Sequence, residues 1–143
     1  MQIEGRCHCG NIGYRLNWPG DGAEIPVRAC GCTFCTKHAG VWTSHREADL
    51  VVTVRDESAI SKYGFGTGSA DFYVCSRCGV VPFVISAIDN HLYAVVNINT
   101  FERIDPSTFV RTTTNFDGED IESRLERRKR NWIRTVRFSA SGA

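Results

Sequence analysis

The sequence predicts a mainly β domain, and two observations support that prediction. Five short runs rich in β-branched and aromatic residues recur along the chain, at residues 11–18, 49–55, 69–75, 80–86 and 92–98. Turn-forming residues separate these runs, at positions 19–22, 64–69 and 89–90. Short strands divided by turns in this way are typical of a compact, mainly antiparallel β structure.

One helix is predicted near the C-terminus, over residues 121–136. Apolar side chains recur there with helical spacing, at Ile121, Leu125, Trp132 and Val136, although a basic residue interrupts them. Acidic residues precede the stretch, which suits the positive N-terminal end of a helix. Five basic residues within it are interpreted as a solvated helix face: Arg124, Arg127, Arg128, Lys129 and Arg130.

The length of the chain suits a single domain over residues 1–143. Its 17 basic and 16 acidic residues leave a formal net charge of +1, which offers no overall attraction to nucleic acid or to an anionic membrane. The N-terminus lacks the apolar region of a secretory signal, and the longest apolar stretch, residues 79–88, is too short for a membrane span. We therefore expect a soluble, cytoplasmic protein without a membrane or nucleic-acid partner, whose oligomeric state the sequence does not indicate.

Seven cysteines fall into three tight groups: Cys7 and Cys9, then Cys30, Cys32 and Cys35, then Cys75 and Cys78. An odd number of clustered cysteines without a secretory signal favours metal ligation over a disulfide framework. The last pair is a C-x-x-C followed by Gly79, which is typical of a zinc knuckle because the turn directs both sulfurs toward one ion.

The simplest division of the cysteines gives two zinc sites with different roles. Cys7, Cys9, Cys75 and Cys78 would form a closed, structural site, and Cys30, Cys32 and Cys35 would form a second site that water or substrate completes. Spacing alone also allows another division, in which Cys7 and Cys9 join Cys32 and Cys35. A three-thiolate site with an exchangeable ligand is the usual arrangement for catalysis.

Three blocks of the sequence resemble the glutathione-dependent formaldehyde-activating enzyme family, which includes centromere protein V and has the Mss4-like β fold. They are GRCHCGNIGYRL (5–16), CGCTFCTKHAG (30–40) and YGFGTGSADFYVCSRCGVVPF (63–83). YAVVNIN (93–99) and NFDG (115–118) are similar to the centromere-protein-V-like branch. The resemblance covers a core of residues 3–118 and implies an antiparallel Mss4-like domain with the helix at its C-terminal end.

The resemblance also implies two zinc ions per chain, divided as above, and a carbon–sulfur lyase activity. In the founding reaction glutathione condenses with formaldehyde to S-(hydroxymethyl)glutathione, so a small thiol and an aldehyde are the expected partners. Zinc lowers the pKa of a bound thiol and so favours attack on the aldehyde carbon. Whether the reaction runs toward synthesis or cleavage is left open.

Residues beside the three-cysteine group are candidates for handling the substrate. Lys37 is predicted to contact a substrate carboxylate, and His38 or His45 to transfer a proton, because these residues follow the group closely in sequence. Two other functions stay open at this point. A fourth protein ligand, such as either histidine, would make the second site structural and the domain a binding module for protein or nucleic acid, and a partly oxidised group would make it a redox or metal sensor.

Overall fold

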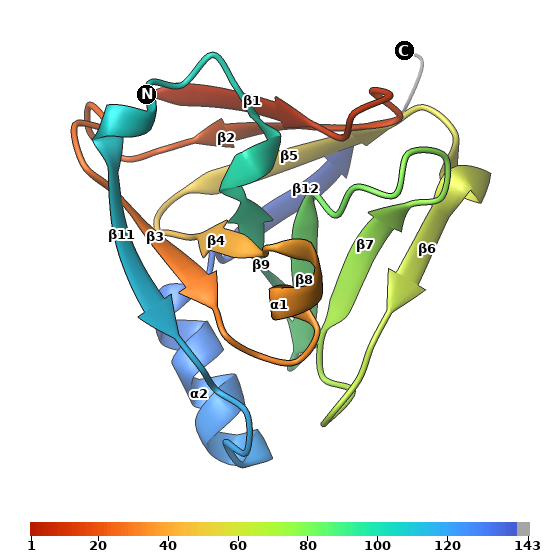
Figure 1. Cartoon of the computed structure of the whole chain (residues 1–143), viewed down its shortest axis with the longest axis vertical. Helices are drawn as coiled ribbons and strands as arrows, with labels where there is room; N and C mark the ends of the chain where they lie inside the picture. Colours follow the sequence, from red (N-terminus) through yellow and green to blue (C-terminus); the bar gives the residue numbers. More distant parts are fainter. Residues whose placement is uncertain (140–143) are drawn as a thin grey trace.

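Two β-sheets share one hydrophobic core in the computed structural model, which describes residues 1–139 (Figure 1). The first sheet has the spatial order β10 (Phe101–Glu102), β1 (Gln2–Arg6), β2 (Ile12–Asn17), β5 (Asp49–Val54), β12 (Thr135–Ser139). The second has the order β11 (Phe109–Thr114), β3 (Ile25–Cys30), β4 (Val41–Thr43), β9 (His91–Asn97), β8 (Phe83–Ile88), β7 (Asp71–Cys75), β6 (Ile60–Tyr63). The mainly β fold class is confirmed, and the five predicted runs are β2, β5, β7, β8 and β9.

Most neighbouring strands pair antiparallel, as predicted, but two pairs in the described range are parallel. β11 runs parallel to β3, with Thr114 opposite Cys30 at the end of the pair. β12 runs parallel to β5 at the other sheet's edge. Both parallel partners come from the C-terminal third of the chain, which therefore completes sheets that the first half begins.

The core lies between the sheets because strand residues alternate between buried and exposed positions. On β2 the side chains of Ile12, Tyr14 and Leu16 are buried, and β5 adds Leu50 and Val52 to the same cluster. Burial of each aliphatic side chain of this size contributes about 1.5–3 kcal/mol. This shared core fixes the relative position of the strand ends that carry the cysteines.

Two α-helices and three short 3-10 helices are present in residues 1–139: α1 (Cys35–His38), α2 (Ile121–Asn131), η1 (Glu57–Ala59), η2 (Ile98–Thr100) and η3 (Pro106–Thr108). Asp120 caps α2, because its Oδ1 accepts a hydrogen bond of 2.9 Å from the backbone N–H of Ser123. Figure 1 shows α2 at the end of the molecule opposite β1 and β2. Neither α-helix in this part of the chain is long and apolar enough to cross a membrane.

The predicted helix over residues 121–136 is wrong beyond Asn131. Ile133 is fully buried and exchanges two backbone hydrogen bonds of 2.9 Å with Ala94 on β9. The chain then continues as β12. At the end of the predicted stripe Trp132 is buried and Val136 is half-buried. Both lie on extended backbone because pairing with the sheets replaces the helical hydrogen bonds.

Candidate metal centres

The first cysteine cluster lies where turns of the two sheets meet. Cys7 and Cys9 lie in the turn between β1 and β2, Cys75 ends β7, and Cys78 lies in the turn before β8. Their four sulfur atoms lie within 4.8 Å of one another. The structure thus groups Cys7 and Cys9 with Cys75 and Cys78, as in the first of the two divisions that their spacing allowed.

Sulfur distances in this cluster fit a tetrahedral zinc ion. Cys9 Sγ lies 3.8 Å from Cys7 Sγ and 3.5 Å from Cys75 Sγ. Tetrahedral ligands at the usual zinc–sulfur distance of about 2.3 Å lie about 3.8 Å apart. The donor set and its spacing therefore suit a closed four-thiolate site.

Backbone geometry around the cluster favours thiolates. The N–H of Ile12 donates to Cys7 Sγ at 3.3 Å, and Gly79 has a φ of +80° with no atom near the position of a Cβ, so glycine is required there by conformation alone.

Burial raises the pKa of Cys7 to about 12. Burial acts in the same direction on Cys78, but backbone hydrogen bonds outweigh it and lower the pKa of Cys78 to about 6. A shared cation would keep both sulfurs deprotonated.

The second cluster joins the end of a strand to the start of a short helix. Cys30 ends β3, Cys32 lies in the following turn and Cys35 begins α1, and their sulfurs also lie within 4.8 Å of one another. The N–H of Cys35 donates to Cys32 Sγ at 3.3 Å. A hydrogen bond with Cys35 lowers the pKa of Cys30 to about 6 and, together with burial, raises the pKa of Cys35. One anionic sulfur among three is a suitable start for a cation site.

A fourth protein ligand for this cluster is absent from residues 1–139, because no His, Asp, Glu or further Cys atom joins the group. His45 packs against Trp18 instead, with ring centroids 5.5 Å apart. His38 packs against Phe34 at 4.4 Å. The closing ligand that a purely structural second site requires is therefore not supplied by this part of the chain.

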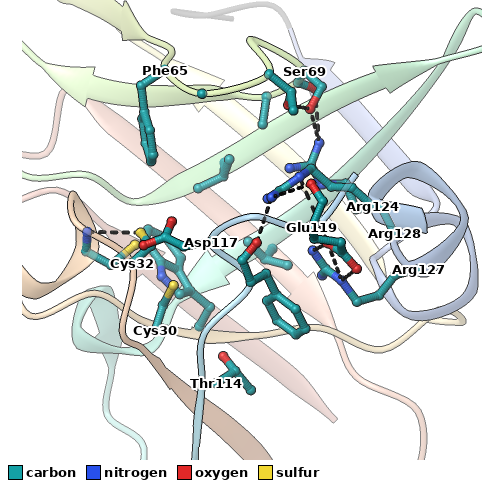
Figure 2. A pocket seen from close by; sticks show the side chains of 18 of the residues that line it. Cys30, Cys32, Phe65, Ser69, Thr114, Asp117, Glu119, Arg124, Arg127 and Arg128 are labelled. Carbon is teal, nitrogen blue, oxygen red and sulfur yellow. Dashed lines mark hydrogen bonds and ion pairs between the residues drawn. The ribbon is translucent and has the colours of Figure 1, made fainter. Parts of the chain in front are cut away.

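A cavity of about 490 Å³ begins at the three cysteines. Aromatic rings contribute to its lining, including Trp42, Phe65, Phe72, Phe116 and Trp132. Figure 2 shows Cys30 and Cys32 on one side of this space and Arg124, Arg127 and Arg128 on the other. The cavity therefore has a sulfur-rich end and a cationic end, and aromatic rings form part of its wall.

The cationic end corrects the prediction of a solvated basic face on α2. Arg128 is only 6% exposed, and its Nη1 donates to Ser69 Oγ at 2.8 Å and to Ser86 Oγ at 3.0 Å. Arg127 donates to both carboxylate oxygens of Glu119, at 2.9 Å for the shortest bond. Arg130, by contrast, is exposed as predicted. Three arginines of α2 thus line the cavity and do not form a solvated face.

The loop before α2 adds a carboxylate beside the cysteines. Asp117 lines the same cavity as Cys30 and Cys32, and Figure 2 shows it on their side of that cavity. The loop is attached to the cysteine turn by a hydrogen bond of 2.7 Å from the N–H of Gly31 to the carbonyl of Thr114. The NFDG segment was singled out in the sequence only for its resemblance to a family branch, so the role of Asp117 in the cavity was missed.

The three candidates for substrate handling that were predicted from proximity, Lys37, His38 and His45, do not line the cavity. Lys37 is exposed on α1, and neither Lys37 nor His38 lines the cavity. His38 lies between the rings of Phe34 and Trp42, and its Nε2 is enclosed without a hydrogen-bond partner in the described range. Burial lowers the pKa of His38. Their proposed contacts with substrate and proton stay predictions.

Comparison with known proteins agrees with this geometry. Residues 2–116 match the family model described as glutathione-dependent formaldehyde-activating enzyme, which is most of the chain. A crystal structure of a Rhodobacter sphaeroides protein is similar to this fold with a TM-score of 0.57 and 24% sequence identity, over 78% of this chain and 99% of that one. The fold, the cysteine blocks and the match over residues 2–116 agree, and the chain belongs to the glutathione-dependent formaldehyde-activating enzyme family.

Proposed function

We propose that the protein is a zinc-dependent carbon–sulfur lyase that acts on the adduct of a small thiol and an aldehyde, such as S-(hydroxymethyl)glutathione. One observation supports this most strongly. The cluster of Cys30, Cys32 and Cys35 has no fourth ligand from residues 1–139 and lies at the end of a cavity. A binding module with two closed sites would need that ligand and would have no use for the cavity.

Two zinc ions per chain fit the two clusters, with separate tasks. The four-cysteine cluster encloses its ion and holds the fold together. At the three-cysteine cluster a bound zinc ion supplies Lewis-acid chemistry and lowers the pKa of a substrate thiol. All further contributions in this proposal come from the side chains of the cavity.

These side chains position the substrate and move its proton. Cys30, Cys32 and Cys35 hold the metal, while the aromatic walls exclude water that would compete with the thiol. Asp117, which lines the cavity, would accept the thiol proton and return it to the carbonyl oxygen as the carbon–sulfur bond forms. In the cleavage direction the hydroxyl proton leaves, the carbon–sulfur bond breaks, and thiol and aldehyde are released without any redox change.

The test is NMR exchange spectroscopy of glutathione and formaldehyde in the presence of the zinc-loaded protein. The reaction also proceeds spontaneously, so the measured quantity is the rate of adduct formation above that background. We expect a clear acceleration by the native protein. Cys35→Ser should keep the fold but lose the acceleration, because only two sulfurs remain at the second cluster. A native, fully zinc-loaded protein with no acceleration contradicts the proposal.

A further inference from the structure

The cationic end of the cavity contains buried donors that lack partners. Arg128 is more than nine-tenths buried, and its Nη1 is held by Ser69 and Ser86. Its Nε is enclosed without a hydrogen-bond partner within residues 1–139, and so is the Nε of Arg124. Buried donors without partners are rare in native proteins because each is costly, and a bound water or anion commonly satisfies such a group. Both side chains line the same cavity.

Positive charge exceeds negative charge among the side chains that line the whole cavity. The cavity is lined by four arginines, Arg28, Arg124, Arg127 and Arg128, and by two carboxylates, Asp117 and Glu119. Glu119 is already engaged by Arg127 through three hydrogen bonds. Burial, and then the charges of Arg124 and Arg127, lower the pKa of Arg128 to about 10. A buried cation cluster in excess of its anions is stabilised by an added anion.

We propose that Arg128 and Arg124 form the subsite that binds a carboxylate of the substrate thiol. This rests on the proposed function, which places the sulfur of the substrate at the other end of the cavity. Guanidinium groups bind carboxylates with strong charge-assisted hydrogen bonds. The anchoring of Arg128 by Ser69 and Ser86 fixes its orientation before the ligand arrives, which lowers the entropic cost of binding.

The subsite belongs to a part of the chain that the family model does not match. The match ends at residue 116, whereas α2 begins at Ile121. The C-terminal segment thus supplies one end of a cavity whose other end carries the family's cysteine block. Substrate choice is then set by this segment and the metal chemistry by the matched region.

The experiment compares two thiols that differ in one charge. Zinc-loaded protein is titrated with 3-mercaptopropionate and with its neutral amide, 3-mercaptopropanamide, and binding is followed by calorimetry and by the fluorescence of Trp42 and Trp132, which line the cavity. We expect the carboxylate to bind about 10- to 100-fold more tightly. Arg128→Gln should remove this preference and leave the affinity for the amide unchanged. Arg130→Gln removes the same charge from the exposed side of α2 and should preserve the preference.

The design separates failure of the subsite from failure of the proposed function. Equal binding of both thiols by the native protein, or a preference that survives in Arg128→Gln, overturns the subsite while leaving the thiol chemistry intact. Propionate, which has no sulfur, should bind weakly to the native protein and not to Arg128→Gln even if no thiol adduct forms. Should Arg128→Gln fail to fold in thermal melting, Arg124→Gln at the half-buried neighbouring position gives the same comparison, and an unchanged preference there counts against the subsite.

Discussion

Glu119 is the residue that organises the arginines of α2. Its carboxylate accepts hydrogen bonds from Arg127 and lies 3.9 Å from Arg124 Nε. Both ends of the Arg127–Glu119 pair are mostly buried, with side chains 17% and 19% exposed. The hydrogen bond from Arg127, and then the charges of the neighbouring arginines, lower the pKa of Glu119 below its usual value. The residue therefore links the charge state of the cavity to the stability of the fold.

Because folding lowers the pKa of Glu119, the stability of the fold should depend on pH. Because the folded pKa of Glu119 lies below the unfolded value of about 4.3, its stabilisation is complete above that value and is lost as the pH falls through the folded pKa. Glu119→Gln should therefore lower stability by about 1 kcal/mol at pH 7. The difference in melting temperature between the native protein and Glu119→Gln should shrink as the pH falls below about 4.

Metal release in acid affects both proteins, so the difference between them is the relevant measurement. Equal metal content across the pH series, checked by mass spectrometry, is the control. A difference that stays constant from pH 7 to pH 3 would show that Glu119 acts through shape and not through charge.

The C-terminal segment is an integral element of the fold, although the family match ends before it. Ile133 is fully buried in the shared core, Trp132 packs beneath the cavity, and β12 covers the edge of β5. A chain ending at residue 118 would lose the burial of both side chains, worth about 3–6 kcal/mol together, out of a typical total of 5–15 kcal/mol. We expect this truncated chain to be largely unfolded or insoluble by circular dichroism and sedimentation.

Ile121→Ala is the matched control for the truncation, because Ile121 is 44% exposed at the start of α2. It should fold normally. A truncated chain with native melting behaviour would show that the segment contributes only to the cavity.

Strands that alternate strongly were predictable from the sequence, and those that depend on distant partners were not. The turn at Asp89 and Asn90 has positive φ at both residues, 52° and 63°, which matches the left-handed turns that join tight hairpins. β3 was missed because Pro26 interrupts its pattern. β11 was missed because most of its residues are exposed, and its parallel partner is some 80 residues away, as the pairing of Thr114 with Cys30 shows.

The candidate site, like the fold, was predictable from the sequence only in part. The cysteine clusters were predictable because ligand chemistry restricts the residue type and turns restrict the spacing. The inward position of the arginines of α2 was not predicted, because a charged helix face is normally exposed to solvent. A signal was nevertheless present: Arg124 and Arg128 are four residues apart, on the face that also carries Leu125, and that face has too few apolar residues to cover a sheet.

For the whole molecule, the four-cysteine cluster joins the two sheets at one side of the shared core, to which Cys7 and Cys75 themselves belong. Cys7 and Cys9 follow β1 of one sheet, and Cys75 and Cys78 belong to the β7–β8 connection of the other. Apparent zinc binding of about 10–16 kcal/mol in small peptides is comparable with the whole stability of a domain. The second cluster, by contrast, lies within one sheet and its adjoining helix, so losing its metal removes no link between layers.

This asymmetry gives different expected results for one substitution at each cluster. Cys75→Ser should yield insoluble or unfolded protein, because three sulfurs bind the ion more weakly and the two sheets then lose the link between them. Cys35→Ser should remain folded, with close to native circular dichroism, and carry about one zinc ion fewer per chain by mass spectrometry. The same serine substitution is made at a buried cysteine in both cases, so general loss of a buried thiol cannot explain a difference. Equal damage from the two would show that both clusters are structural, and the cavity would then lose its metal-based role in the proposed reaction.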